Sequence, residues 1–288
     1  MLKKFFNISD LNREQLISIL SGNSVSRDLT GKNIGLIFEK YSTRTRLSFQ
    51  VAINKLGGNS LDIKFDELNI SRSETFEDTF RAMSCYLDGL IYRTNSHEKL
   101  LRAYKFFKKP IINALSEKSH PCQIISDLFT LKKRFECLDL SILWMGDMNN
   151  VCFSYVDAMN LLPEVKFTIC TTKNIISSHN WTLPKNVEVI SSLDNFDLTN
   201  INALMTDVFV SMNDEENQEK LSELSKYQVT AEILNKTSDD CVFMHCLPAN
   251  VGLEVTQDVI ESKKSIVWEQ AKNRMFAQQQ LLQNIDWS

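Results

Sequence analysis

Short apolar runs alternate with longer amphipathic segments along the chain from Lys32 onward. This alternation is typical of parallel sheets with helices packed on them. In the first half of the chain, strands are predicted at residues 34–38, 61–65, 87–92 and 110–114. In the second half, strands are predicted at residues 140–145, 165–171, 187–190, 203–206, 242–244 and 265–268. These are too many strands for one small sheet, so two sheets are expected.

Two segments show the clearest helical patterns. The first, at residues 43–56, has apolar side chains at positions i, i+3, i+4 and i+7, namely Phe49, Ala52, Ile53 and Leu56. Ser42 is the predicted N-cap of this helix, and the pair Gly57-Gly58 is predicted to end it. The second, at residues 122–135, lies between the two sets of strands. It is therefore predicted to bridge two domains.

The expected fold class is α/β, with two α/β domains that each hold a mainly parallel sheet flanked by helices and are joined by bridging helices. The length of 288 residues suits two domains of ordinary size. The first domain is expected at residues 1–121, the bridging helix at 122–136 and the second domain at 137–270. A C-terminal helix at about 271–288 is expected to pack back on the first domain.

Composition and charge exclude several classes of partner. Hydrophobic residues make up 43% of the chain and charged residues 24%, and no apolar run has the length that a membrane helix needs. The net charge of −4 gives no broad positive field, so a nucleic-acid partner is not expected. Seven cysteines without a Cys-x-x-Cys pair indicate reduced thiols. The N-terminal segment does not resemble a signal peptide, and the expected compartment is the cytoplasm.

A phosphate site is the first chemistry that the motifs suggest. The chain contains neither Gly-x-Gly-x-x-Gly nor a P-loop motif, so dinucleotides and P-loop nucleotide chemistry are not expected. Directly after a predicted strand, a helix opens with the run Phe38-Glu39-Lys40-Tyr41-Ser42-Thr43-Arg44-Thr45-Arg46. N–H groups at a helix start, hydroxyl groups and a guanidinium group together suit a small anion. The alternative is that Ser42 only caps the helix and the arginines form a solvated face.

Two further clusters carry candidate catalytic groups. The run Ser119-His120-Pro121-Cys122-Gln123 stands at the start of the bridging helix, from which His120 and Gln123 are expected to point into the gap between domains. Taken alone, His120 is also consistent with a structural cap or a core residue. The run Met244-His245-Cys246-Leu247-Pro248-Ala249 follows a strand, where ligands of such sheets bind. A buried, inert thiol is the alternative for Cys246.

Together and in this order, these motifs resemble those of the carbamoyltransferases, and in particular of the ornithine-specific branch. The matching elements are Phe-Glu-Lys-x-Ser-Thr-Arg-Thr-Arg, His-Pro-x-Gln and His-Cys-Leu-Pro. The resemblance runs nearly from end to end and includes the segments 146–150, 206–212 and 271–274. The aspartate-specific relatives lack the Asp-x-x-x-Ser-Met and His-Cys-Leu-Pro elements, so the amine-side motifs favour ornithine.

The resemblance implies an activity and a set of site residues. It implies transfer of the carbamoyl group of carbamoyl phosphate to the δ-amine of L-ornithine, giving L-citrulline and phosphate, without metal or organic cofactor and in a homotrimer. The catalytic residues that it implies are Arg93, His120, Asp207 and Cys246. The residues that it implies for carbamoyl phosphate are Ser42, Thr43, Arg44, Thr45, Arg93, His120, Gln123, Cys246, Leu247 and Arg274, with Asn69 of a neighbouring subunit. Arg274 is expected to approach from the other domain. Ornithine is expected to contact Asn150, Asp207, Ser211 and Met212.

The chain departs from the family pattern at three places. Asn213 stands where the family usually has Gly after Ser-Met, in a loop that swings over ornithine. Asn69 stands where many members carry a Gln that reaches the neighbouring subunit. The stretch between Thr171 and Val187 is too short for the full helix that the family usually has there.

Two alternative functions remain open at this point. One is a carbamoyltransferase for another amine, such as an acylated ornithine, a lysine-like diamine or putrescine, and the motive is Asn213. The other is a non-catalytic homologue that serves as a binding or regulatory subunit. It fits poorly, because a chain without catalysis has no reason to keep so many buried polar groups together.

Overall fold

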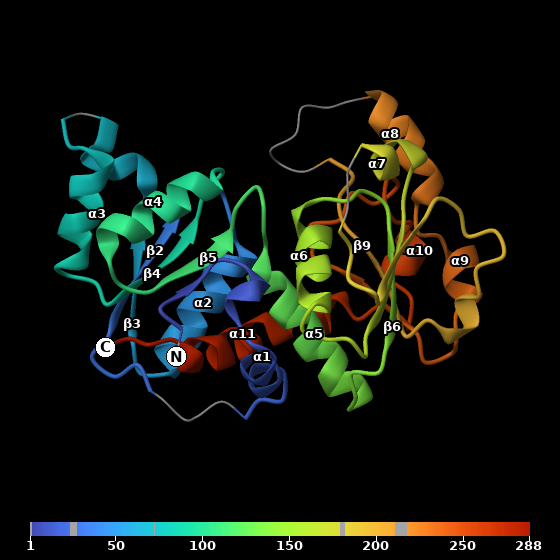
Figure 1. Cartoon of the computed structure of the whole chain (residues 1–288), viewed down its shortest axis with the longest axis horizontal. Helices are drawn as coiled ribbons and strands as arrows, with labels where there is room; N and C mark the ends of the chain where they lie inside the picture. The colour runs from blue at the N-terminus through green and yellow to red at the C-terminus, as the bar shows by residue number, and fades with distance from the viewer. Residues whose placement is uncertain (1, 24–27, 72, 179–181, 211–217) are drawn as a thin grey trace. The chain divides into compact units, whose positions relative to one another are not determined.

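The computed structural model describes residues 2–23, 28–71, 73–178, 182–210 and 218–288 (Figure 1). The chain divides into two compact units, one formed by Met1–Phe129 with Lys272–Ser288 and the other by Thr130–Ala271. Two helices run from one unit into the other, α5 (Pro121–Phe135) and α11 (Val267–Asn284). Each unit has its own parallel sheet with helices, which confirms the predicted α/β class.

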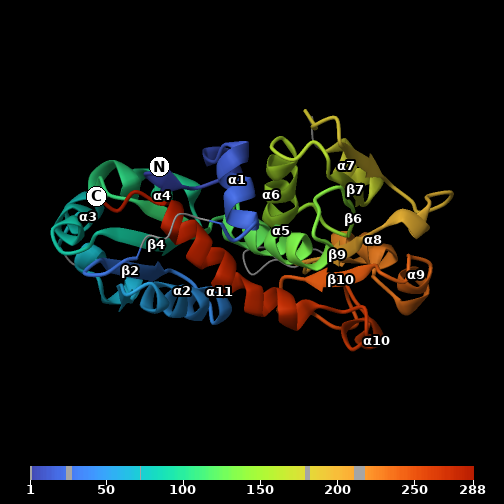
Figure 2. The same ribbon diagram turned by 90° about the horizontal axis from the view of Figure 1, so that it is seen from below.

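The first unit holds a five-stranded sheet in the order β1-β5-β4-β2-β3, and all neighbouring strands are parallel. Its strands are β1 (Lys4–Phe5), β2 (Asn33–Phe38), β3 (Asn59–Ile63), β4 (Gly89–Arg93) and β5 (Ile111–Leu115). Its further helices are α1 (Arg13–Leu20), α2 (Arg44–Lys55), α3 (Phe76–Ser84) and α4 (His97–Phe107). Figure 2 shows α2 and α11 on one face of this sheet and α4 on the other.

The core of the first unit explains why the strands are short apolar runs. Helices cover both faces of the sheet, so strand residues are buried on either side; Leu36 and Ile37 of β2, which point to opposite faces, are both fully buried. On the face of α3 and α4, Phe80 and Leu100 pack with Tyr92 of β4 in one apolar cluster.

The second unit holds a parallel sheet in the order β10-β9-β6-β7-β8. Its strands are β6 (Ser141–Met145), β7 (Lys166–Cys170), β8 (Val187–Ile190), β9 (Ala203–Thr206) and β10 (Val242–His245). Its further helices are α6 (Asn150–Met159), α7 (Lys173–Ser177), α8 (Gln218–Leu224), α9 (Ala231–Asn235) and α10 (Gln257–Ile260). Within the described part of the chain, no helix is both long and apolar enough to cross a membrane.

Three details of the sequence-based elements are corrected. The strand predicted at 265–268 is wrong, because only Ser265 makes an isolated bridge to Phe243 and α11 begins at Val267. A run of four residues is too short for its periodicity to separate a strand from a helix start. The strand predicted at 61–65 lies two residues earlier, as β3, and β1 was not predicted, since two residues carry no pattern.

The start of α2 also differs from the prediction. Ser42 is not the N-cap, because the helix begins at Arg44 and Thr43 occupies the N-cap position in a helical conformation, without a capping hydrogen bond from its side chain. The end is as predicted: Gly57 has a φ of +80°, and the Gly58 N–H donates to the Ile53 carbonyl at 3.1 Å. A glycine in the left-handed region is the usual way to end a helix.

Candidate active site

The predicted site residues of the first unit follow three neighbouring strands. In a parallel sheet, the carboxyl ends of the strands meet at one edge, where ligands bind. Phe38 ends β2 and leads to the segment 42–45, and Arg93 ends β4 directly beside Phe38 in the sheet register. Strand β5, the other neighbour of β4, leads to His120 just before α5. The topology therefore brings the phosphate motif, Arg93 and His120 to one edge.

Arg274 connects the phosphate motif to the start of α5. Its Nη2 atom donates to Thr45 Oγ1 at 2.7 Å, and its Nη1 atom donates to Gln123 Oε1. Gln123 in turn donates from Nε2 to Asp127 Oδ1 at 2.7 Å, so its amide orientation is fixed. Thr45, Gln123 and Arg274 are all buried.

Arg274 does not come from the other unit, and that prediction is wrong. Residues from Lys272 onward belong to the same compact unit as Thr45 and Gln123. The physical reason is that α11 begins in the second unit and continues after Ala271 as part of the first. A sequence pattern does not show where along a helix such a boundary falls.

The electrostatics of this edge favour an anion. Burial, and then the positive charges of Arg274 and Arg44, lower the pKa of Arg93. Three guanidinium groups thus lie close enough to repel one another, and a bound anion would relieve this repulsion and accept their hydrogen bonds. Burial, followed by the charges of Arg274 and Arg93, also holds the pKa of His120 well below its usual range. His120 is therefore a neutral imidazole at neutral pH.

Asn69 lies in a short 3-10 helix (Asn69–Ser71) on the surface of the first unit. Its carbonyl accepts from the N–H groups of Ser73 and Glu74, both at 3.3 Å. In the same chain, the Arg274 guanidinium group donates to Thr45 and Gln123.

In the second unit, Asp207 joins the ends of three neighbouring strands. It follows β9, and its Oδ1 atom accepts from the thiol of Cys246, after β10, at 2.7 Å. Its Oδ2 atom accepts from the Asn149 amide, in the loop after β6, at 2.7 Å. Asp207 is buried, and each of its two carboxylate oxygens accepts a hydrogen bond. The arrangement places a fixed carboxylate beside a thiol.

Asn150 begins α6, and the loop before it needs Gly146. The Asn149 side chain caps the helix by accepting from the N–H groups of Val151 and Cys152. Gly146 has a φ of +117°, and a Cβ atom there would lie 2.5 Å from Phe209 Cε1. A side chain at this position would therefore displace the loop that carries Asn149 and Asn150.

His245 and Glu254 form a buried pair behind Cys246. The His245 Nδ1 atom accepts from the Leu247 N–H at 2.9 Å, so the ring proton lies on Nε2, which is 3.3 Å from Glu254 Oε1. Both side chains are fully buried. The pair holds the backbone that carries Cys246 and Leu247.

The atoms near Asp207 include possible metal ligands. Asp207, His245 and Cys246 each have a ligand-type atom, all within 4.8 Å of one another. Hydrogen bonds within the protein already use the Cys246 thiol, the Asp207 carboxylate and the His245 Nδ1 atom. A thiol must lose its proton to bind a metal, and this would break the hydrogen bond that Cys246 donates to Asp207.

Ser211 and Met212, which are predicted to contact ornithine, lie outside the described residues. So does Asn213, which stands where the family usually has Gly. Directly after that segment, Lys220 of α8 forms an ion pair with the buried Asp147 at 2.8 Å. The sequence prediction assigned no role to Asn149, His245 or Glu254. Asn149 and His245 stand inside recognised motifs, whereas Glu254 has no local signal and is identified only by its contacts.

Known proteins resemble the chain over nearly its full length. Residues 3–133 match the family model "Aspartate/ornithine carbamoyltransferase, carbamoyl-P binding domain", and residues 138–285 match "Aspartate/ornithine carbamoyltransferase, Asp/Orn binding domain". The ornithine carbamoyltransferase of Methanocorpusculum labreanum is 39% identical, over 98% of this chain and 97% of its own. That of Methanosphaera stadtmanae is 38% identical, over 99% of each.

Solved structures of ornithine carbamoyltransferases also resemble the chain over nearly its full length. Ornithine carbamoyltransferase from Pyrococcus furiosus has a TM-score of 0.84 at 31% identity, over 99% of this chain and 97% of that chain. The anabolic enzyme from Campylobacter jejuni has a TM-score of 0.86 at 29% identity, over 97% and 98%. With two matched domains and relatives of such identity along its whole length, the chain belongs to the aspartate/ornithine carbamoyltransferase family.

Proposed function

We propose that the protein is an ornithine carbamoyltransferase, which transfers the carbamoyl group of carbamoyl phosphate to the δ-amine of L-ornithine and forms L-citrulline and phosphate. The observation that carries the proposal is the group of arginines at the start of α2, where Arg274 bonds Thr45 and Gln123 and lies near Arg93 and His120. The two matched family models and the names of the relatives support the same reaction.

In the first unit, the proposed role of the residues follows from the charge of the substrate. Carbamoyl phosphate carries a dianionic phosphate, for which we assign the hydroxyl and N–H groups of Ser42, Thr43 and Thr45 together with Arg44. Around the carbamoyl group we assign Arg93, His120, Gln123 and Arg274. As the amine attacks, negative charge grows on the carbonyl oxygen, and donors already fixed in place stabilise this transition state more than the ground state.

His120 suits the role of a neutral donor or acceptor at the carbamoyl group. Because burial and the neighbouring arginines lower its pKa, it adds no further positive charge at neutral pH. A neutral imidazole polarises a carbonyl by hydrogen bonding and does not protonate the leaving phosphate or the attacking amine.

In the second unit, we assign the amino acid. Asp207 supplies an anion for an ammonium group of ornithine, and Asn150, Ser211 and Met212 complete the contacts. The δ-amine must be neutral to attack, and a site that desolvates it favours the free base. Cys246, whose thiol donates to Asp207, orients this amine and is not a covalent nucleophile. We also retain the proposal that Cys246 and Leu247 contact the carbamoyl group.

The site residues are proposed to work in a homotrimer. The support within this chain is a pair of exposed apolar side chains one turn apart on α2, Leu47 and Val51. Tyr41 and Leu61 of the same unit are exposed as well, Tyr41 to 97%. Contiguous exposed apolar groups mark protein–protein contacts. Asn69, which is exposed in its own chain, is assigned to the site of the neighbouring subunit.

The test is a citrulline assay on the purified protein. Ornithine and carbamoyl phosphate are varied separately, and a panel of other amines is assayed under the same conditions. Saturable citrulline formation with ornithine as the best amine is expected. A protein that binds neither substrate and forms no carbamoylated product with any amine would contradict the proposal. If another amine reacts better than ornithine, the protein is a carbamoyltransferase for that amine.

A further inference from the structure

Glu39 belongs to the phosphate motif but has no role in the reaction as described above. It follows the last residue of β2 and comes three residues before Ser42. Its backbone N–H donates to the carbonyl of Arg93 at 3.0 Å. One end of the motif is therefore attached directly to the backbone of a residue assigned to the carbamoyl group.

The Glu39 side chain adds two more attachments. Its Oε1 atom accepts from the hydroxyl of Tyr92, and its Oε2 atom accepts from Lys99 Nζ at 3.2 Å. Tyr92 is the residue before Arg93 in β4 and is fully buried, and Lys99 lies in the first turns of α4. The carboxylate, only 7% exposed, thus joins the end of β2, the end of β4 and a helix.

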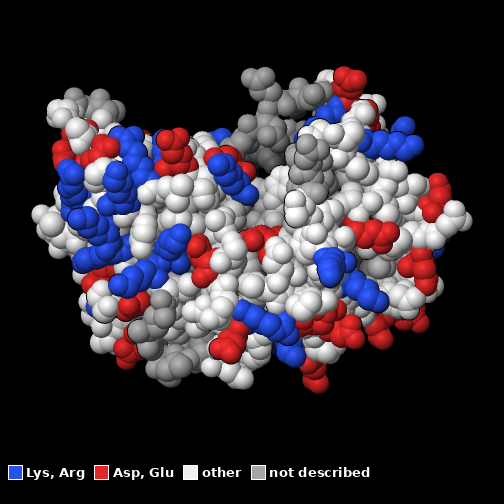
Figure 3. All heavy atoms as spheres, in the orientation of Figure 1, with Lys and Arg blue, Asp and Glu red and all other residues white. Residues whose placement is uncertain are grey.

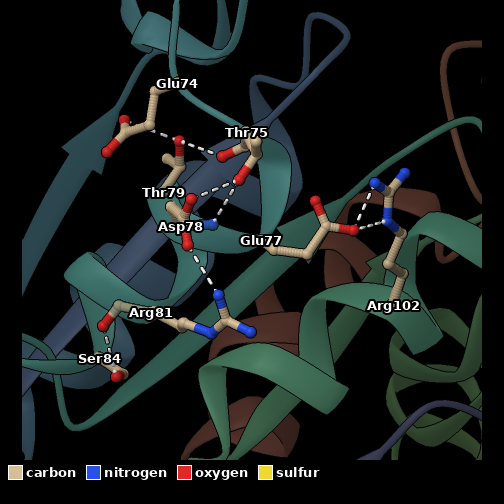
Figure 4. A network of polar contacts seen from close by, with 8 residues as sticks. All are labelled: Glu74, Thr75, Glu77, Asp78, Thr79, Arg81, Ser84 and Arg102. Atoms are coloured by element: carbon tan, nitrogen blue, oxygen red, sulfur yellow. Dashed lines mark hydrogen bonds and ion pairs between the residues drawn. The ribbon is translucent and has the colours of Figure 1, made fainter.

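Nearby ion pairs on the same face are of a different kind. Figure 3 shows Lys and Arg side chains gathered over α3 and α4. In Figure 4, Arg81 points to Asp78 within α3, and Arg102 of α4 points to Glu77 of α3. Such exposed pairs contribute little to stability. The Lys99 pair differs because its acidic partner is buried and is part of the motif.

We propose that Glu39 is a positioning residue for carbamoyl phosphate, and that Lys99 and Tyr92 hold it in place. Through its backbone and its carboxylate, Glu39 fixes the spacing between Arg93 and the segment 42–45. Binding and catalytic groups need their geometry set within about 0.5 Å, and a neighbouring shell of hydrogen bonds provides this. This inference rests on the proposed function.

Lys99 has a second task in this arrangement, which is to balance charge. A buried carboxylate without a cation is unfavourable in itself and, so close in sequence to a dianion site, opposes the binding of phosphate. Burial and then the Glu39 charge raise the pKa of Tyr92, so its hydroxyl keeps its proton and remains a donor. Of Tyr92 and Lys99, which both donate to the Glu39 carboxylate, Lys99 is the one with a cationic side chain.

Four variants test the proposal: Glu39→Ala, Glu39→Gln, Lys99→Met and the double variant Glu39→Gln/Lys99→Met. Glu39→Ala is expected to lower kcat/KM for carbamoyl phosphate at least about tenfold, mainly through KM, while Glu39→Gln, which still accepts from Tyr92, stays within about threefold of wild type. Lys99→Met is expected to lie between them, and the double variant to be more active than Lys99→Met because no unbalanced carboxylate remains. The KM for ornithine is expected to change little.

The matched control is Arg102→Met, which removes a cation from the same helix, one turn after Lys99, where the partner Glu77 is not part of the motif. Its kcat/KM is expected to equal that of wild type. Calorimetric binding of inorganic phosphate and thermal melting are measured for every variant. Variants that melt earlier but bind phosphate and react as wild type does would show a purely structural Glu39 and overturn the inference. An inactive wild type would instead contradict the proposed function, and phosphate binding by the variants would still test the positioning role.

Discussion

At the scale of single residues, Arg44 tests the assignment of the phosphate. Replacing Arg44 by Ala removes a cation from the start of α2, and replacing it by Lys loses the planar fork that binds two oxygens at once. We expect kcat/KM for carbamoyl phosphate to fall at least about 100-fold in both variants, as for the loss of one transition-state donor. Steady-state citrulline kinetics measure this. Near-normal kinetics of Arg44→Ala would falsify the assignment.

Asp207 tests the amine side. Asp207→Ala removes the anion that accepts from both Cys246 and Asn149, so we expect most ornithine-dependent turnover to be lost. Asp207→Asn, which keeps the shape but not the charge, is the matched variant. If binding of inorganic phosphate stays at the wild-type level in both variants, the loss is confined to the amino-acid side. Full activity of Asp207→Asn would show that the charge is not needed.

His120 gives a prediction on stability against pH. Its pKa in the folded protein is well below its ordinary value of about 6.5, so below that pH the unfolded chain takes up a proton that the folded protein does not. We expect the free energy of unfolding to fall as the pH decreases from about 6.5, with one such histidine contributing up to about 1.4 kcal/mol per pH unit.

Urea unfolding of wild type and His120→Gln at several pH values measures this contribution. Wild type should lose more stability than the variant between pH 6.5 and 5, and equal slopes would contradict the prediction. The fully buried Cys122 adds nothing in this range, because burial raises its pKa to about 12.

At the scale of the elements, the variant Gly146→Ala tests the loop between β6 and α6, and Gly252→Ala, outside this loop, is its control. Gly146→Ala meets both a positive φ of +117° and the Phe209 ring at 2.5 Å, whereas Gly252→Ala meets only a positive φ of +98°, with nothing within 4 Å. Strain at one such position is of the order of 1–3 kcal/mol. We expect Gly146→Ala to reduce the free energy of unfolding by more than Gly252→Ala does.

The same pair of variants separates stability from function. Gly146→Ala should also raise the KM for ornithine, because the displaced loop carries Asn149, the donor to Asp207. Gly252→Ala should leave this KM unchanged. Denaturant unfolding measures the stability of each variant, and citrulline kinetics measure its KM for ornithine. An unchanged ornithine KM in Gly146→Ala would show that this loop does not position the ornithine site.

The elements also show what a sequence can predict. Nine of the predicted strands correspond to observed strands, because parallel strands buried on both faces are short apolar runs with clear ends. The strand predicted at 265–268 was wrong, since four residues that run into the start of a helix have no decisive period. The motifs predicted which residues follow the strand ends. They did not predict the partners that fix them, such as Glu254 for His245, because such contacts join distant parts of the chain.

At the scale of the whole molecule, the proposed trimer makes activity depend on concentration. Subunits that share sites lose activity when they separate. We expect light scattering of the active protein to give three chains per particle, and specific activity to fall upon extreme dilution. Replacing Leu47 and Val51 on α2 by Glu should weaken the trimer, so that specific activity falls at a higher protein concentration than in wild type. A monomer with unchanged activity on dilution would rule out the trimer.

The division of the chain into units has a consequence for the order in which the protein is made. The second unit is one continuous stretch, whereas the first needs residues from Lys272 onward, which are synthesised only after the whole of the second unit. Among them are Arg274, which bonds Thr45 and Gln123, and Trp287, whose ring packs against Gly89 in β4. The second sheet can therefore form during synthesis, while Arg274 reaches Thr45 and Gln123 only after the whole second unit has been made. A nascent chain that stops before Arg274 lacks the guanidinium group that joins these two residues.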